Sequence, residues 1–551
     1  LGKLGVCHID ALVLTHTDRD QCCCLYRNNL PSEFASFQLV APAGDGPLLR
    51  TDPLAEFWRQ YQLRGCPSSY HAPALPREPD ATIGGDGELC MGGIRLCAIA
   101  TPGHTRGALS YIVEWHGRQL VFCGDAVCQE GHIPQLYQLE WDHWTPEGIL
   151  AAWYGLERLA GNRIDRLLPA HGEPIGGGRT VLRTAQRRLL DLVRAKTAIA
   201  PGARSRWADS ELLDCGARRL SPHLYSVGGN GFVLAASDGT ALVIDPTRGD
   251  MPALEALLEE TGLQPDVATA SHYHIDHTDA LNVVRQRWGA RVWLHPWVAE
   301  PIVDRNRYDL PWLPAEAIAA DRLLPEDGSF RWRNYRFDIR PFPGQTWWHC
   351  AFDTDVDGRH VLFSGDNFQP PTRWNGTGGF CAYNGSRFSG FARSARIVLD
   401  MAPDLICNGH RCIYAFDADH YRRILTWCGK AEAAVQALCP AGVDWLADYD
   451  PRACRWEPFV QTASAGDELK PAFIYTNHRS ESIRITIVPV PRVGFQWTPA
   501  KRTLTISPGA SKRAKFLLQV EAPGGRHILA ADILEPSRIR AEAAVTIVDI
   551  N

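Results

Sequence analysis

Four side chains that bind metal ions well lie within six residues of one another in the second half of the chain: His272, His274, Asp276 and His277. They follow an apolar stretch that predicts a buried strand. Imidazole and carboxylate groups are ligands that zinc, iron and manganese accept. Burying three histidines and an aspartate together is costly without ions or polar partners. The motif therefore predicts a metal site rather than a group of packing histidines.

Further candidate ligands follow later predicted strands. Asp366 comes shortly after the apolar run 361–363, and His410 comes after the run that ends in Cys407-Asn408-Gly409. Loops at the ends of strands usually present the chemistry of an α/β protein, because the sheet holds them rigidly. Helical patterns lie between the strands, for example from Met251 to Thr261 before Gly262. Two further histidines and this aspartate would complete two neighbouring ion sites.

The first half of the chain repeats these motifs in the same order. The interval from His104 to Asp125 is 21 residues, and the interval from Gln345 to Asp366 is also 21. The next intervals, to His171 and to His410, are 46 and 44 residues. A long repeat with matched polar motifs predicts domain duplication. The candidate ligands of the first half are His16, Asp18, Asp20, His104, Asp125 and His171.

The order His-x-His-x-Asp-His, Gly-Asp and Gly-His resembles the metallo-β-lactamase superfamily, over residues 216–440. The Pro-Gly-His-Thr and Gly-Asp motifs of the first half are most similar to the glyoxalase II-like hydrolase branch. The resemblance implies αββα domains and two divalent cations, zinc first, with iron or manganese as alternatives. It implies His272 and His274 as ligands of one ion, and Asp276, His277 and His410 as ligands of the other. Asp366 would bridge the ions, and Asp276 would act in catalysis by orienting a hydroxide held between them.

The second half departs from the family pattern at one position. The family places a histidine after Pro-Gly, as His104 is placed in the first half, but this position is Gln345 in the second half. His349 lies four residues later and would share a face with position 345 if the loop made one helical turn. His349 is therefore the predicted remaining ligand of the first ion. Gln345 and an incomplete site are the alternatives.

The first half departs further. Asp18 replaces the second histidine of the motif and Gln21 replaces the last, so the second ion loses support. His16, His104 and Asp125 could still hold a single ion, because two histidines and a carboxylate also bind non-haem iron. This set resembles the persulfide dioxygenases of the superfamily. A decayed domain that serves packing, or a purely structural ion, is the alternative.

The motifs divide the chain into three parts. Residues 1–200 are predicted to form a metallo-β-lactamase-like domain, and residues 216–445 a second one with the intact motif. Only 15 residues precede His16, so the first domain is expected to lack its opening strands. Short alternating strands in residues 465–551 predict a β-sandwich, which resembles immunoglobulin-like modules. Segment 374–384, rich in glycine and aromatic residues, either lines a substrate pocket or forms an ordinary surface loop.

The composition of the chain limits the kinds of molecule that we expect it to bind. The chain has 45% apolar and 22% charged residues and a net charge of −5, so a small-molecule substrate is expected, with no nucleic acid and no membrane. Scattered cysteines and the absence of a signal peptide favour the cytoplasm. The sequence does not indicate the oligomeric state.

Three hypotheses for the function follow. The first is a metal-dependent hydrolase acting on an ester, a thioester or a lactam. The second is an iron-dependent redox enzyme or a phosphodiesterase, and the third is a metal-binding interaction protein without catalysis. The fold by itself does not choose between them.

Overall fold

The computed structural model describes residues 5–22, 25, 36–49, 77–134, 139, 146–197, 208–308, 310, 312–368, 385, 388–440, 454–536 and 539–551. Segment 374–384 lies outside these residues, and so does the side chain of Asp20. The described cysteines are all free thiols, as the scattered spacing predicts. None of the described helices combines the length and the apolar composition that a membrane crossing requires.

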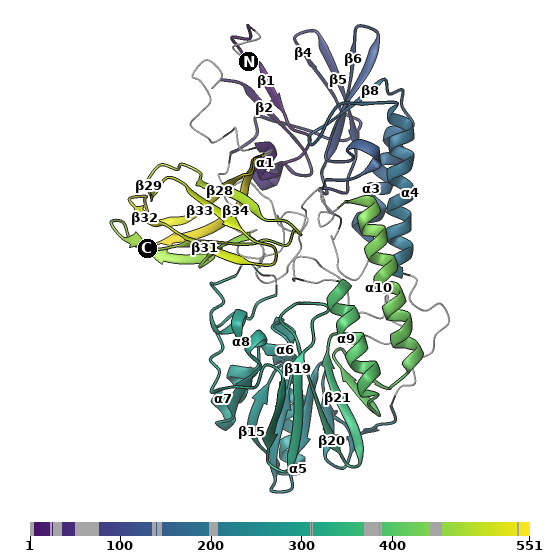
Figure 1. The fold of residues 1–551 in the computed structure, drawn as a ribbon, viewed down its shortest axis with the longest axis vertical. Coiled ribbons are helices and arrows are strands. Elements are labelled where there is room, and N and C mark those ends of the chain that lie inside the picture. Colours follow the sequence, from purple (N-terminus) through teal and green to yellow (C-terminus); the bar gives the residue numbers. More distant parts are fainter. Residues whose placement is uncertain are drawn as a thin grey trace.

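Two sheets packed face to face form the second half of the chain (Figure 1). The first has eight strands: β10 (Glu211–Leu212), β11 (Arg218–Ser221), β12 (Leu224–Val227), β13 (Gly231–Ala235), β14 (Thr240–Ile244), β15 (Gln264–Thr269), β16 (Arg291–Leu294) and β17 (Arg322–Leu323). The second has six strands: β18 (Gly328–Trp332), β19 (Tyr335–Pro341), β20 (Cys350–Val356), β21 (Arg359–Gly365), β22 (Leu405–Asn408) and β23 (Cys412–Ala415). Their facing side chains share one core, in which the rings of Phe232 and Phe363 lie 5.6 Å apart.

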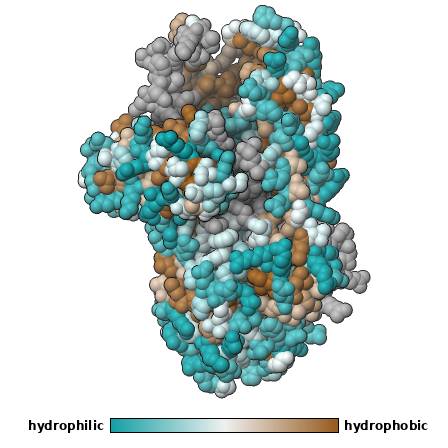
Figure 2. Space-filling model, viewed as in Figure 1, coloured by the Kyte–Doolittle hydropathy of each residue, from teal (hydrophilic) through white to brown (hydrophobic). Residues whose placement is uncertain are grey.

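Helices cover the outer faces of both sheets. The six helices of this half are α5 (Met251–Thr261), α6 (Ile275–Thr278), α7 (Leu281–Trp288), α8 (Pro296–Val303), α9 (Phe388–Met401) and α10 (Ala418–Leu438). The predicted helix over 251–261 is confirmed, and it ends at Gly262, whose φ of +72° favours glycine. Strands β12, β13 and β22 are buried along their whole length because both faces of each sheet are covered. Figure 2 shows a mostly hydrophilic surface over this half, as expected when the apolar side chains lie between layers.

The pairing directions bring the polar motifs to one edge. Strands β14, β15, β16 and β17 run parallel to one another, and β21 runs parallel to β22. Parallel strands end at the same edge of a sheet, so the residues that follow them meet there. Asp245 follows β14, His272 follows β15, Asp366 follows β21 and His410 follows β22. The fold thus explains how residues far apart in sequence form one cluster.

The first half contains a three-stranded parallel sheet and a six-stranded sheet. Their strands are β1 (Ala11–Val13), β2 (Gln38–Pro42), β3 (Ala81–Ile83), β4 (Glu88–Met91), β5 (Ile94–Ala100), β6 (Leu109–Trp115), β7 (Arg118–Gly124), β8 (Arg166–Pro169) and β9 (Ile175–Gly176). The longer helices are α3 (Glu147–Ala160) and α4 (Gly178–Thr197), and the short α1 (Arg19–Cys22) contains the end of the first motif. The order and directions of β4–β9 match those of β18–β23, including a register shift before Gly124 and before Gly365.

Residues 454–551, the C-terminal module, consist of strands in the part that is described. They are β24 (Cys454–Glu457), β25 (Val460–Ala463), β26 (Glu468–Leu469), β27 (Ala472–Thr476), β28 (Ile483–Pro489), β29 (Phe495–Thr498), β30 (Arg502–Ile506), β31 (Ser511–Lys515), β32 (Leu517–Val520), β33 (Gly525–Leu534) and β34 (Ile539–Ile550). β24 pairs with β27, and β25 pairs with β34, so the module starts before residue 465. Whether it is immunoglobulin-like stays a prediction.

Candidate metal centre

The loop after β15 and the short helix α6 carry the first group of candidate ligands. His272 is completely buried, and His274 is the residue before α6. Asp276 and His277 lie on α6, where His277 is completely buried and the Asp276 side chain is 45% exposed. Within this arrangement Asp276 is the carboxylate that a substrate or water can reach. The imidazoles form the wall behind it.

Two ligand groups adjoin at Asp366. Nitrogen and oxygen atoms of His272, His274 and Asp366 lie within 4.8 Å of one another, and so do those of Asp276, His277 and His410. Asp366 Oδ1 is 3.1 Å from His277 Nε2, and its Oδ2 is 3.0 Å from His410 Nε2. The Asp366 carboxylate therefore contacts both groups. Six of the seven predicted side chains meet in this way.

A buried aspartate that the sequence analysis missed orients two of the histidines. Asp245 accepts hydrogen bonds from the Ser271 backbone N–H at 2.6 Å and from the Ser271 hydroxyl at 2.7 Å. The same hydroxyl lies 3.1 Å from His272 Nδ1, so it accepts the Nδ1 proton while it donates to Asp245. His272 Nε2 then carries a lone pair, faces the cluster and has no hydrogen-bond partner among the described residues. A buried, unpartnered imidazole nitrogen in this position fits a metal ligand.

Asp245 acts on His277 as well. Its Oδ2 is 3.1 Å from His277 Nδ1, which leaves His277 Nε2 directed at Asp366. A carboxylate behind a metal-binding histidine fixes the imidazole tautomer and makes it more basic. Asp245 could have been found from the sequence, because it is a polar residue directly after an apolar strand, as several of the candidate ligands are.

Asn230 connects two loops of the second ligand group by hydrogen bonds. Its Nδ2 donates to the Asp276 carbonyl oxygen at 2.7 Å, and its Oδ1 accepts the His410 backbone N–H at 2.6 Å. Asn230 follows β12 and is 4% exposed. It therefore joins two ligand loops that are far apart in sequence.

The charges of the cluster are strongly coupled. Burial alone would raise the pKa of Asp366, but His410 and His277 hold it well below its usual range. Asp366 in turn raises the pKa of His410. Burial, with neighbouring imidazoles, lowers the pKa of His272 well below 6.5, and burial lowers that of His349 to about 3. These two rings are thus neutral at ordinary pH, the form that binds metal.

The structure places Gln345, rather than His349, where the first half has its histidine. Gln345 Nε2 is 3.0 Å from Asp366 Oδ2, just as His104 Nε2 is 3.2 Å from Asp125 Oδ2. His349 stacks on the ring of His272 at 4.9 Å and is not in either ligand group. The helical turn assumed for this loop is absent, because residue 349 forms a β-bridge with residue 272 instead. His349 as a ligand stays a prediction.

Gly365 explains how His349 fits behind the cluster. A Cβ atom at this position would lie 2.6 Å from His349 Nε2 and 2.4 Å from Ser271 Oγ. Its φ is +52°, which a side chain also disfavours. Because residue 365 is glycine, the end of β21 can lie close to His349 and Ser271, and Asp366 follows directly.

The first half also assembles a cluster. Ligand atoms of His16, His104 and Asp125 lie within 4.8 Å of one another, and His171 Nδ1 is 2.7 Å from Asp125 Oδ1. Asp18 takes the place of the second histidine of the motif, and its Oδ2 is 3.0 Å from His104 Nε2. The predicted residues therefore meet, with Asp20 outside what is described. The arrangement offers one group of three ligands.

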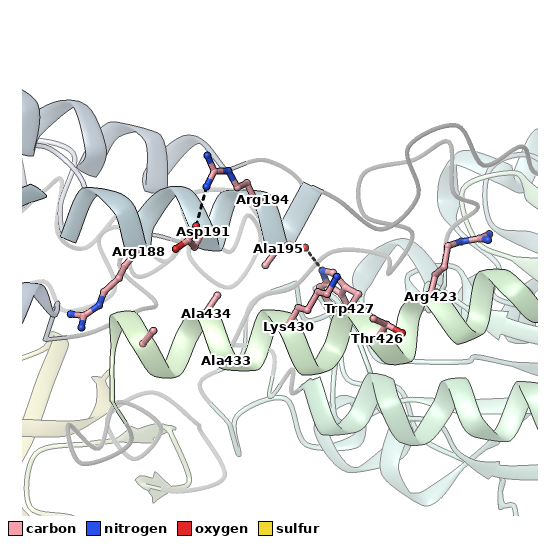
Figure 3. Close-up of a pocket in the computed structure, with 11 residues that line it drawn as sticks. Arg188, Asp191, Arg194, Ala195, Arg423, Thr426, Trp427, Lys430, Ala433 and Ala434 are labelled. Atoms are coloured by element: carbon pink, nitrogen blue, oxygen red, sulfur yellow. Dashed lines mark hydrogen bonds and ion pairs between the residues drawn. The ribbon is translucent and has the colours of Figure 1, made fainter. Parts of the chain in front are cut away.

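A separate groove of about 610 Å³ runs between α4 and α10 (Figure 3). Two of its arginines have partners within the protein: Arg194 pairs with Asp191 at 3.1 Å, and Arg188 donates to the Glu130 carbonyl oxygen at 2.7 Å. None of the candidate metal ligands lines it. The groove marks the junction of the two halves rather than the metal cluster.

Comparison with known proteins identifies the class to which this site belongs. Residues 225–410 match the family model of the metallo-beta-lactamase superfamily, and this part of the chain is a member of that superfamily. The matched residues include the predicted ligands of the second half, from His272 to His410.

The chain is also similar, over part of its length, to individual known proteins. The chain is 36% identical over 128 residues to a hydroxyacylglutathione hydrolase of Albidiferax ferrireducens, covering 23% of this chain and 42% of the relative. It is 29% identical over 137 residues to the probable metallo-hydrolase YqgX of Bacillus subtilis, covering 23% and 64%. The chain thus spans about half the length of the curated relatives it matches. Among solved structures, a beta-lactamase from Chitinophaga pinensis matches with 19% identity and a TM-score of 0.32, over 43% of this chain and 98% of that one.

Proposed function

We propose that the second half of the chain is a metal-dependent hydrolase that acts on a small-molecule ester, thioester or lactam. The observation that carries the proposal is the pair of ligand groups that adjoin at Asp366 and are held by Asp245 from behind. Two divalent cations bound there, zinc first, would polarise the scissile group and lower the pKa of water from about 15.7 to about 7. The names of the relatives make an S-acyl glutathione thioester the first substrate to test.

The residues of the chain have distinct proposed roles. His272 and His274, with Gln345 or His349, hold one cation, and Asp276, His277 and His410 hold the other. Asp366 is shared between the two groups, because it lies with His272 and His274 in one group and its two oxygens face histidines of the other.

Asp276 is the proposed catalytic residue. It is the most exposed carboxylate of the cluster, and Asn230 Nδ2 lies 3.3 Å from its Oδ2. This contact aims the carboxylate toward the open side, where it can orient the attacking water and hold its proton.

We also infer that the chain is a tandem of two such domains, residues 1–200 and 216–445, followed by the C-terminal module. The identical order and directions of β4–β9 and β18–β23 support the duplication. The described first half has no counterpart of β10–β14.

A second candidate function belongs to the first half. Its two histidines and one carboxylate suit a single ion, including non-haem iron, and such an ion would serve either structure or redox chemistry. The two halves would then differ in both number and kind of ion.

Metal content and a substrate screen test the proposal together. The full chain is loaded with zinc, iron or manganese, its bound metal is counted, and thioester, lactam, lactone and phosphodiester substrates are offered. We expect two ions in the second half and hydrolysis that Asp276→Ala lowers by at least about 100-fold. Asp279→Ala, on the same loop but outside both ligand groups, is the matched control. Unchanged hydrolysis in Asp276→Ala would refute the role of that residue, and bound iron with no hydrolysis of any of these substrates would favour the redox hypothesis.

A further inference from the structure

The C-terminal module is joined by hydrogen bonds to the loop that follows α8, and it lies on the side of the second half where α6 and α8 are found (Figure 1). The backbone N–H groups of Phe459 and Val460 both donate to the Asn306 carbonyl oxygen, at 2.7 and 3.0 Å. Glu457 Oε1 is 2.5 Å from Arg307 Nε in the same loop. The module is therefore attached to this loop by backbone hydrogen bonds and by an ion pair.

Glu457 neutralises several cations at this contact. Besides Arg307, it lies 2.9 Å from Arg513 and 4.0 Å from Arg455, and its side chain is only 13% exposed. Arg455 also lies over the ring of Tyr308, 4.8 Å from its centre. Removing the Glu457 charge would leave three guanidinium groups close together without their common partner, and that of Arg455 is the most buried of the three, at 13% exposed. Glu457 is thus the carboxylate that the three arginines share at this contact.

A relay of side chains leads from the contact to the metal loops. Glu300 of α8 lies 3.4 Å from Arg307, accepts the hydroxyl of Tyr308, and accepts the indole N–H of Trp348 at 3.2 Å. Trp348 is 1% exposed, and its ring packs edge-on against Tyr273 at 5.9 Å. Tyr273 lies between the two histidines of the first ligand group. Glu300 thus joins the module contact to the loops that carry these ligands.

A second connection passes through Trp312. Its carbonyl oxygen accepts the N–H of Ile275, the first residue of α6, at 2.7 Å, and its ring lies 5.2 Å from that of His274. The backbone of Trp312 has φ of +57°, which is strained for a bulky residue and persists only where its surroundings enforce it. Trp312 packs on the core that includes Phe459 and Ile547 of the module. The module and Trp312 therefore belong to the same continuous core, which also extends through both halves.

We propose that the C-terminal module positions the metal-binding loops of the second half, with Glu457 as the positioning residue at its contact. This inference rests on the proposed function, since it assumes that the cluster binds ions. It assigns the module a role within the enzyme: the module sets the metal affinity of a site to which it supplies no ligand. Glu457 acts through Arg307, Glu300 and Trp348, and it does not touch the reacting atoms.

The test compares Glu457→Gln with Asp549→Asn in the full chain. Asp549 pairs with Arg526 at 2.7 and 2.8 Å on the same module, so the control also removes one carboxylate charge from an arginine pair. Zinc affinity is measured by competition with a chelator. The absorption spectrum of the cobalt-loaded protein reports the ligand geometry. We expect Glu457→Gln to bind zinc about 10-fold more weakly and to alter the cobalt spectrum, and Asp549→Asn to match the wild type within about twofold.

Trp348→Phe tests the relay itself, because it keeps an aromatic ring and removes the N–H that Glu300 accepts. We expect a loss of zinc affinity similar to that of Glu457→Gln. Wild-type affinity and spectrum in Glu457→Gln would overturn the inference, and wild-type values in Trp348→Phe alone would overturn the relay. If the wild-type chain itself binds no zinc, the proposed function fails instead, so the two failures are distinguishable.

Discussion

Replacing Asp245 with asparagine tests how the second half prepares its histidines for metal. The side chain is 2% exposed, accepts two hydrogen bonds from the Ser271 N–H and hydroxyl, and lies 3.1 Å from His277 Nδ1. Asparagine has the same shape but only one acceptor atom. If its oxygen keeps the Ser271 N–H at 2.6 Å, its NH₂ group faces His277 Nδ1. His277 must then accept at Nδ1 and carry its proton on Nε2, the atom that faces Asp366.

The expected magnitude follows from this change of tautomer. Nε2 of His277 must be unprotonated to bind an ion, so the wrong tautomer competes directly with metal. Loss of an outer partner of this kind typically weakens metal affinity by about 10–100-fold, which is about 1.4–2.7 kcal/mol. The metal-free protein also loses a hydrogen bond to a charged group, worth about 1.5–3 kcal/mol.

The assay is chelator competition for zinc on the full chain, together with denaturant unfolding of the metal-free protein. Asp353→Asn is the matched control, because Asp353 is also buried, at 5% exposed, and lies 3.0 Å from His360 and 2.9 Å from Arg340. We expect both variants to lose stability and only Asp245→Asn to lose zinc affinity. Equal zinc affinity in Asp245→Asn and the wild type would refute the reasoning.

Three further predictions concern single positions. Gln345→His supplies the imidazole that His104 supplies in the first half, and titration calorimetry is expected to show zinc affinity at least about 10-fold higher; no gain would mean that His349 already fills the site. Gly365→Ala forces a Cβ atom to within 2.6 Å of His349 Nε2 and is expected to lower the zinc content of purified protein, whereas Gly358→Ala, which meets no atom within 4 Å, leaves that content unchanged. Burial lowers the pKa of His295 in the folded chain, so acid protonates this histidine more readily in the unfolded chain. The contribution of His295 to the free energy of unfolding is therefore complete above about pH 6.5 and falls at lower pH. In His295→Asn the melting temperature should fall less steeply between pH 7 and pH 5, and a fall as steep as in the wild type would contradict this.

Most residues of the candidate metal cluster could be identified from the sequence alone. His272, His274, Asp276 and His277 lie close together along the chain, so their meeting needed no knowledge of topology. Asp366 and His410 could be added because each follows an apolar strand, and the ends of parallel strands meet. The αββα layering follows from strands that alternate with helices.

Other features depend on how loops turn, and the pattern of residue types did not predict them. The choice between Gln345 and His349 relied on an assumed helical turn, whereas the real loop bends so that His349 pairs with His272 across a β-bridge. The attachment of the C-terminal module depends on a contact between Arg307 and Glu457, which are 150 residues apart in the chain. Both charges are ordinary surface residues when only their neighbours in sequence are considered.

The clusters of the two halves differ in the groups that contact their buried histidines. In the first half, Asp18 stands where a histidine would be and lies 3.0 Å from His104 Nε2, so the carboxylate itself satisfies the buried imidazole. In the second half, His274 stands in place of that carboxylate, and ligand atoms of His272, His274 and Asp366 lie within 4.8 Å of one another. An unpaired buried nitrogen costs about 1–3 kcal/mol, which a bound cation removes. We therefore expect a bound cation to stabilise the second half more than the first.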